Sequence, residues 1–431
     1  MSVVVVGAGV AGFSAALSAR SVGADVLVID AAASATSLAG GAWDIATDPM
    51  GSISECFRPT RTVADRVADV RRDHPHHPYA RLGVDPVGAV AEAHDPVLAA
   101  LGIYRPLDLD THGLLVATEL GLPRRTATAQ KTVLSLEHVP GGVLAVARLR
   151  GYREGDARFQ AASLADQADL AGAERHFAAV DVEFFRRRSD ALLHPHEVAA
   201  LLDGAEGRAA LVRGVSRAIT GLGFGGLLLP PVLGLTDDTV AGALTQQLSV
   251  SVGETLASLA GPQGLRLDRR IRRALEEAGC RLRNARVSRI AVEGGVARLT
   301  LSGGEELNAD AVVLATGKLV GGGIELWEGL MREPLAGLPM YADGRSAPLP
   351  SSPEGPDPVV LFGDDPFRRG AGYRHGVGYD TRLRALGSEG EVVSENLFVA
   401  GALLDGFDPA DGTGLGCCAT TGWIAGRSAA A

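Results

Sequence analysis

Three glycines near the N-terminus have a spacing that suits the binding of phosphate groups. Gly7, Gly9 and Gly12 form the pattern G-x-G-x-x-G, and Asp30 follows some way after them. The first glycine permits a tight turn, the second lets the backbone approach a pyrophosphate, and the third lets a helix pack closely on a strand. A carboxylate at the position of Asp30 accepts hydrogen bonds from a ribose diol and disfavours the 2′-phosphate of NADP.

The elements that must position these residues can also be read from the sequence. Residues 3–6 are four valines, which have the length and β-branched composition of a buried strand, and a second strand is expected over 24–29. Between them we expect a helix over 11–22, whose N-terminal amides and positive dipole end would face the phosphates. This order of strand, turn, helix, strand and acid predicts a dinucleotide site. It does not separate NAD from FAD.

Two further glycine segments are typical of flavoproteins. Gly40 and Gly41 follow the second expected strand, where small residues let the backbone approach a flavin, with a simple turn as the alternative. A buried strand is expected over 311–315, and it runs directly into Thr316 and Gly317. A strand that ends in Ala-Thr-Gly recurs in two-dinucleotide-fold flavoproteins, where it closes the first sheet and its turn packs near the glycine fingerprint.

The C-terminal segment favours a flavin over a nicotinamide. A strand expected over 397–400 ends at Gly401, and a glycine-rich loop then leads to a helix that should start near residue 416. The N-terminus of such a helix would stabilise the negative charge that a reduced flavin carries. Three glycines of the loop would let the backbone lie against the flavin ring: Gly412, Gly414 and Gly416.

These patterns predict an α/β protein with a Rossmann-like FAD/NAD(P)-binding fold that is discontinuous in sequence and carries an inserted second α+β domain. Residues 1–78 and 264–431 are expected to form the flavin-binding domain, the latter including a hairpin of strands over 287–292 and 296–301. Residues 79–263 would form the inserted domain, which contacts substrate or a partner. The proline-broken segment 74–78 marks the first boundary.

Composition limits the remaining function classes. A chain of 431 residues, 46% hydrophobic and 21% charged, can bury the cores of two domains. The net charge of -10 argues against a nucleic-acid partner. The four cysteines form no C-x-x-C pair, so the sequence predicts no metal or iron–sulfur ligand set. The apolar run 3–19 is glycine-interrupted and too short to span a bilayer, so any membrane contact is expected to be peripheral.

Longer segments give the chain a more specific resemblance. These segments are SLAGGAWDIA, VLGLTDD, REPLAGLP, GVGYDTRLRAL and ENLFVAGALLDGFDP. In their order, and in the length of the chain, they resemble the B subunit of anaerobic glycerol-3-phosphate dehydrogenase. The resemblance covers essentially the whole chain. The last of the five segments is its most specific part, whereas the N-terminal glycine pattern is common to many flavoproteins.

The resemblance implies an activity and partners. Enzymes of this family oxidise sn-glycerol 3-phosphate to dihydroxyacetone phosphate and pass electrons toward quinone. The B subunit works with a catalytic A subunit and an iron–sulfur C subunit at the cytoplasmic face of the inner membrane. The resemblance implies FMN as the flavin, whereas the complete glycine turn and Asp30 favour FAD. Many FAD enzymes place an acid where this chain has Ala402, and the nearest acids here are Asp405 and Asp408.

The residues that would carry the chemistry are less clearly marked. Oxidation of a secondary alcohol needs a base near the flavin. Arg374 and His375 precede a glycine turn in the segment expected to approach the flavin, and an ordinary loop histidine is the alternative. Arg332 is a candidate phosphate ligand, with a surface arginine as the alternative. If the A subunit performs the reaction, this chain needs no base.

Two rival functions and two surface features stay open at this stage. The rivals are a free-standing FAD-dependent oxidoreductase of the fumarate-reductase or ketosteroid-dehydrogenase type, and a flavin-free scaffold subunit. The apolar segment 227–235 is expected either to dock a partner or to pack in the core. Residues 164–190 are expected to form an amphipathic helix that ends in the basic run Arg186–Arg188.

Overall fold

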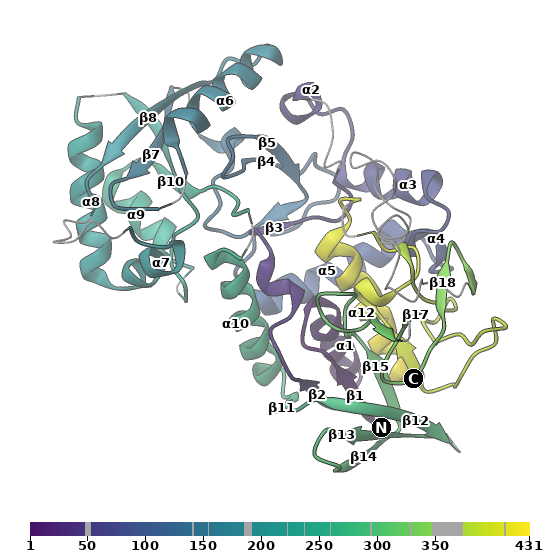
Figure 1. Cartoon of the computed structure of the whole chain (residues 1–431). Coiled ribbons are helices and arrows are strands. Elements are labelled where there is room, and N and C mark those ends of the chain that lie inside the picture. The colour runs from purple at the N-terminus through teal and green to yellow at the C-terminus, as the bar shows by residue number, and fades with distance from the viewer. Residues whose placement is uncertain are drawn as a thin grey trace. The chain divides into compact units, whose positions relative to one another are not determined.

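The computed structural model describes most of the chain (Figure 1). The described residues are 1–47, 53–139, 142–153, 155–184, 192–221, 223–236, 238–258, 260–293, 295–327, 330–346, 374–408 and 411–431. The basic run Arg186–Arg188 lies outside these residues.

The described chain forms two compact units. The first comprises residues 1–36, 64–101 and 270–431, and the second comprises residues 37–63 and 102–269. These bounds differ from the predicted boundaries after residues 78 and 263. Residues 79–101 join the first unit because helix α5 (Pro86–Leu101) packs on the C-terminal helix α12 (Gly414–Ala429), where Trp423 and Arg427 both donate hydrogen bonds to Glu92.

The first unit is built on a parallel sheet of five strands, in the order β11-β2-β1-β15-β21. The strands are β1 (Ser2–Val6), β2 (Asp25–Asp30), β11 (Arg281–Asn284), β15 (Ala311–Leu314) and β21 (Leu397–Val399). Four successive valines form most of β1 and are buried, as a strand with neighbours on both sides requires. The Rossmann-like α/β fold expected from the sequence is confirmed.

Helices α1 (Val10–Ser21) and α12 lie side by side against this sheet (Figure 1). Their close approach depends on glycine. A Cβ atom at Gly422 would lie 2.2 Å from the carbonyl oxygen of Ala11, and one at Gly426 would lie 2.0 Å from that of Ala15. The two helices, predicted from opposite ends of the chain, are therefore held backbone to backbone. This contact positions the N-terminal ends of both helices.

The other elements of the first unit surround the sheet. Strands β12 (Val287–Glu293) and β13 (Val296–Leu301) pair antiparallel, as predicted, and β14 (Glu306–Ala309) extends them. The remaining elements are short: α3 (Val63–Asp73), α4 (Pro78–Arg81), β16 (Glu325–Trp327), β17 (Leu330–Arg332), β18 (Met340–Ala342), β19 (Arg345–Ser346), β20 (Gly376–Val377) and the 3-10 turn η4 (Gly401–Leu403).

The second unit is built on a parallel sheet of four strands, in the order β10-β9-β7-β8. The strands are β7 (Val143–Leu149), β8 (His176–Val182), β9 (Phe224–Leu229) and β10 (Ser251–Glu254). The same unit contains the helices α6 (Ala157–Leu170), α7 (Pro195–Asp203), α8 (Ala205–Ile219) and α9 (Val240–Leu248). Helix α10 (Pro262–Glu277) runs along the chain from this unit into the first.

Smaller elements complete the second unit. They are the turn η1 (Ala35–Leu38), β3 (Ala42–Trp43), α2 (Ile53–Phe57), β4 (Leu114–Ala117), β5 (Pro123–Thr126), β6 (Thr128–Ala129) and the turn η2 (Leu136–His138). Strand β3 pairs with β6 and β4 pairs with β5, both antiparallel. The turn η1 spans the boundary in the chain between the two units, because residues up to 36 belong to the first unit and those from 37 belong to the second.

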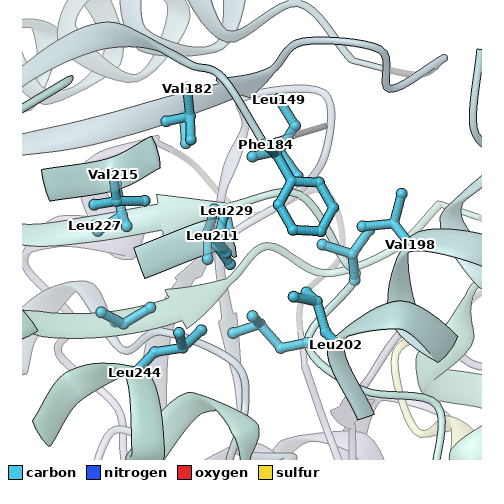
Figure 2. Close-up of a cluster of buried hydrophobic side chains, with 14 of the residues drawn as sticks. Leu149, Val182, Phe184, Val198, Leu202, Leu211, Val215, Leu227, Leu229 and Leu244 are labelled. Atoms are coloured by element: carbon cyan, nitrogen blue, oxygen red, sulfur yellow. The ribbon is translucent and has the colours of Figure 1, made fainter. Parts of the chain in front are cut away.

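The segment 227–235 is core rather than a docking surface. Figure 2 shows Leu227 and Leu229 among the buried side chains between β9 and the neighbouring helices. Both, and Leu228 as well, are 1% exposed, and Val232 is fully buried. The prediction that this segment docks a partner is therefore wrong, because a central parallel strand is apolar on both faces.

The helix predicted over 164–190 is also wrong in its second half. Helix α6 ends at Leu170, and Gly172 has a φ of +63°, which a helix cannot continue through. Residues 176–182 then pair in parallel with all seven residues of β7. The long-range pairing in the sheet overrides the local helical pattern.

Candidate functional site

The glycine turn after β1 has the geometry that its sequence requires. Gly7 has a φ of +105°, and a Cβ there would lie 2.4 Å from the carbonyl oxygen of Ala315 in the neighbouring chain segment after β15. A Cβ at Gly12 would lie 1.9 Å from the carbonyl oxygen of Gly7. Both glycines therefore serve the close packing of the turn, the helix and the adjacent strand.

Gly9 differs from Gly7 and Gly12 because its position is bounded by side chains rather than by backbone. Its backbone is extended, and a Cβ there would meet only side chains, the nearest being the hydroxyl of Thr36 at 3.2 Å. The same hydroxyl accepts a hydrogen bond of 3.2 Å from the backbone N–H of Val10, at the start of α1. The first turn of α1 carries no acidic side chain. This helix end thus presents its positive dipole beside the Thr36 hydroxyl, an environment that suits a phosphate.

Asp30 lies at the carboxyl end of β2, one strand from the glycine turn. Its side chain is 11% exposed, and Oδ2 accepts a hydrogen bond of 2.6 Å from the Arg272 guanidinium of α10. Among the described residues no hydrogen bond reaches its Oδ1. The carboxyl group that the sequence assigns to a ribose diol is therefore held from one side by an arginine that no sequence motif marks.

The turn after β15 brings a lysine toward the C-terminal segment. Gly317 has a φ of +73°, and the Nζ atom of Lys318 donates a hydrogen bond of 2.8 Å to the carbonyl oxygen of Phe407. Burial lowers the pKa of the Lys318 ammonium to about 7, against the opposite effect of three nearby aspartates, which are Asp405, Asp408 and Asp411. This lysine is not among the site residues that the sequence predicts.

One compositional signal points to Lys318. The chain has 41 basic residues, and only Lys131 and Lys318 are lysines. Burial moves the pKa of a lysine readily, whereas an arginine stays charged. A lysine in a chain that otherwise uses arginine is therefore a candidate for proton chemistry.

The segment that leads into α12 carries the remaining predicted glycines. Gly401 has a φ of +73°, a Cβ there would lie 2.5 Å from the Cβ of Ala11, and its N–H donates to the hydroxyl of Thr421 at 3.0 Å. Gly412 and Gly414 also have positive φ, and Gly416 is buried in the first turn of α12. No side chain caps the start of this helix. Its free backbone amides can therefore meet a ligand.

A buried histidine and an aspartate fix this loop. The Nε2 atom of His77 lies 3.3 Å from Oδ2 of Asp411 and 3.2 Å from the hydroxyl of Thr413. The other ring nitrogen of His77 accepts the backbone N–H of Tyr79, so Nε2 carries the proton. Burial raises the pKa of Asp411, but the hydrogen bonds from His77 and Thr413 outweigh it and leave this pKa below its usual value.

Asp405 is the acid nearest to Ala402 in sequence, and it is fully buried. Its Oδ2 accepts hydrogen bonds from Arg81 at 2.7 Å and from the backbone N–H of Gly344 at 2.8 Å. Its Oδ1 is buried and has no partner among the described residues. Burial raises the pKa of Asp405.

His375 and Arg374 differ in exposure, although they are adjacent in the chain. His375 is 8% exposed, and its Nδ1 is buried without a partner among the described residues. Burial, followed by the charge of Lys318, lowers the pKa of His375. The Arg374 side chain is exposed. Arg332, the candidate phosphate ligand, pairs with Glu325 at 3.0 Å.

Gly40 and Gly41 belong to the second unit, whereas the other predicted site residues belong to the first. A Cβ at Gly40 would lie 2.3 Å from the carbonyl oxygen of Ala257, and one at Gly41 would lie 2.7 Å from the side chain of Gln263. Close packing within the second unit therefore explains why both positions carry glycine. Their contact with a flavin stays a prediction.

Most of the chain matches a known family. The family model described as "FAD binding domain" matches residues 2–415. The chain belongs to this family. This flavoprotein thus uses FAD, the cofactor that the glycine turn and Asp30 predict, rather than the FMN that the resemblance implies.

Curated relatives confirm the resemblance found in the sequence. A probable B subunit of anaerobic glycerol-3-phosphate dehydrogenase from Halobacterium salinarum is 29% identical, over 99% of this chain and 97% of the relative. The B subunit of the anaerobic glycerol-3-phosphate dehydrogenase of Pectobacterium carotovorum is 26% identical, over 96% and 94%. Among solved structures, 3-ketosteroid delta1-dehydrogenase from Sterolibacterium denitrificans covers 99% of both chains at 12% identity, with a TM-score of 0.39, too low to support an inference.

The residues of the first unit fit FAD. The start of α1 beside Gly9, with its positive dipole end and no acidic side chain in its first turn, suits a pyrophosphate, and Asp30 offers Oδ1 to a ribose. Two buried polar atoms, Nδ1 of His375 and Oδ1 of Asp405, have no partner among the described residues. Such atoms cost free energy unless a ligand or water satisfies them.

Proposed function

We propose that this flavoprotein is the B subunit of an anaerobic glycerol-3-phosphate dehydrogenase. In this proposal it takes part in the oxidation of sn-glycerol 3-phosphate to dihydroxyacetone phosphate, with electrons passed toward quinone. The observation that carries the proposal is the match to B subunits over nearly the full length of both chains. The FAD-binding fold and the unpartnered polar atoms near its C-terminal segment support it.

In the proposed reaction a secondary alcohol loses a hydride from its carbon and a proton from its oxygen. Bound FAD supplies the hydride acceptor. His375 is the proposed proton acceptor, because its buried Nδ1 lacks a partner among the described residues and its lowered pKa keeps the ring neutral near pH 7. A neutral imidazole can take the hydroxyl proton, whereas an imidazolium cannot.

Lys318 is proposed to assist His375 electrostatically. With a pKa of about 7, its amine can exchange a proton at physiological pH, and its charge acts on His375. The sequence predicts a chemical role for Arg374 together with His375. Because the Arg374 side chain is exposed, we propose instead that it binds the phosphate of the substrate. These two roles make separate predictions for activity and for substrate affinity.

The proposed partners are an A subunit and an iron–sulfur C subunit. The four cysteines of this chain form no C-x-x-C pair, and no group of three or more metal-ligating side chains occurs among the described residues. The onward electron carrier therefore belongs to a partner in this proposal. Within the described part of the chain, no helix is long and apolar enough to cross a membrane. Attachment to the cytoplasmic face of the inner membrane is proposed to run through the partners.

The test is turnover by the chain with an artificial electron acceptor, alone and with its A-type and C-type partners. We expect oxidation of sn-glycerol 3-phosphate, and His375→Asn should lower kcat by about 100-fold or more. The matched control is His112→Asn, since His112 is an exposed histidine of the second unit. Normal kcat in His375→Asn would remove His375 from the mechanism. A chain that purifies without flavin would support the scaffold alternative instead.

A further inference from the structure

We propose that Arg272 is a positioning residue that orients Asp30 toward the adenosine ribose, so that the Arg272–Asp30 pair selects FAD over FMN. FMN has no adenosine ribose, so only FAD can use this carboxyl group. The inference rests on the proposed placement of FAD at the glycine turn. It does not rest on the identity of the substrate.

The geometry of the pair comes from three neighbouring elements. Strand β11 pairs in parallel with β2, with Asn284 in register with Asp30, and the N–H of Ala285 donates to the Asp30 carbonyl oxygen at 3.2 Å. Helix α10 precedes β11 in the chain. From this helix Arg272 donates to Oδ2 of Asp30 at 2.6 Å.

The two carboxyl oxygens of Asp30 differ in their hydrogen bonds, and this difference is the basis of the inference. Arg272 holds Oδ2, while Oδ1 receives no hydrogen bond from the described residues. A guanidinium bond of this kind restricts the rotation of the carboxyl group. Oδ1 is then left as a fixed acceptor for a ribose hydroxyl. The positive charge also offsets the repulsion between Asp30 and the pyrophosphate that binds nearby.

The pair contributes little to folding. The Arg272 side chain is 40% exposed, whereas that of Asp30 is 11% exposed, so water screens the pair from the arginine side and its loss should cost little stability. The variant Arg272→Gln should therefore fold normally. Arg273 provides the matched control, because it is the next residue on the same helix, is 75% exposed and pairs with Glu277 rather than with Asp30.

The test is the affinity of the flavin-stripped chain for three probes: FAD, FMN and ADP. ADP carries the adenosine ribose and pyrophosphate without a flavin. In Arg272→Gln we expect the Kd values for FAD and ADP to rise roughly tenfold, with the Kd for FMN unchanged. Arg272→Lys should recover part of the loss, and Arg273→Gln should bind all three probes as the wild type does.

A double variant separates positioning from direct contact. If Arg272 acts through Asp30, the variant Asp30→Asn/Arg272→Gln should bind FAD no more weakly than Asp30→Asn alone. Losses that multiply in the double variant, equal losses for FAD and FMN, or an unchanged Kd in Arg272→Gln would each overturn the inference. None of these binding measurements involves turnover, so a failure to oxidise glycerol 3-phosphate would leave the inference intact while removing the proposed function.

Discussion

Lys318 donates a hydrogen bond from Nζ to the carbonyl oxygen of Phe407, 2.8 Å away, and so links the turn after β15 to the segment before α12. A long stretch of the first unit separates these two residues in the sequence. Burial lowers the pKa of this lysine to about 7, with Asp405, Asp408, Asp411 and Cys418 acting in the opposite direction. The group therefore couples stability to pH.

Lys318→Met should change the pH dependence of unfolding. Above about pH 7 the folded lysine is neutral, while the unfolded lysine keeps its proton up to its ordinary pKa of about 10.4. The unfolded state then binds more protons, so the free energy of unfolding rises with pH in this window, by at most about 1.4 kcal/mol per pH unit. Denaturant titrations between about pH 7 and 9 should show this rise in the wild type and a smaller one in Lys318→Met. Lys131→Met is the control, and an identical loss of slope in both variants would contradict the assignment to Lys318.

Gly9→Val should remove FAD while leaving the fold intact. The Gly9 backbone is extended, and the first atom of a side chain would lie 3.2 Å from the Thr36 hydroxyl, a tight contact with a side chain that has to shift slightly, so we expect the fold to be retained. The same side chain would fill the space proposed for the pyrophosphate. The flavin content of the purified variant, compared with Gly303→Val in an open turn, provides the measurement. Stoichiometric flavin in Gly9→Val would place the pyrophosphate elsewhere.

Gly426→Ala should lower the free energy of unfolding by about 1–3 kcal/mol, the usual cost of overpacking. Its new Cβ would lie 2.0 Å from the carbonyl oxygen of Ala15, so α12 and α1 must move apart. Gly242→Ala in α9, where nothing lies within 4 Å, is the control. Thermal unfolding of the two variants checks this; equal melting temperatures would mean that the helices separate without cost.

Leu229→Ala should destabilise the chain by about 2–5 kcal/mol, because Leu229 is 1% exposed in the core that Figure 2 shows. Leu170→Ala, at a leucine that is 77% exposed, should change stability by no more than about 0.5 kcal/mol. The free energies of unfolding of both variants, measured by chemical denaturation, test these two predictions. A Leu229→Ala chain as stable as the wild type would contradict the assignment of Leu229 to the core.

Sequence patterns predict the first unit well, because its signals are local. The valine run, the glycine spacing and the acid at position 30 each specify a strand, a turn or a contact within a few residues. The antiparallel hairpin 287–301 follows from alternation and a glycine turn. The terminal helix, expected near residue 416, begins at Gly414.

The features that the sequence does not predict depend on distant pairing. Strand β8 has a helical local pattern, and its seven residues become a strand because they pair with β7. The sequence of segment 227–235 does not show whether it lies in the core or on a docking surface, because an apolar run does not indicate what covers its two faces. Arg272 and Lys318 carry no motif because their partners, Asp30 and Phe407, lie far away in the sequence. Only the rarity of lysine gives a local signal for one of them.

The most direct measurement is anaerobic reduction of the bound flavin by substrate. The FAD-loaded chain, in complex with its partners, is mixed with sn-glycerol 3-phosphate while the visible absorption of oxidised flavin is followed. We predict that this band bleaches, that the enantiomer sn-glycerol 1-phosphate bleaches it far more slowly, and that dihydroxyacetone phosphate is formed. A flavin that dithionite reduces but sn-glycerol 3-phosphate leaves oxidised would contradict the proposed function.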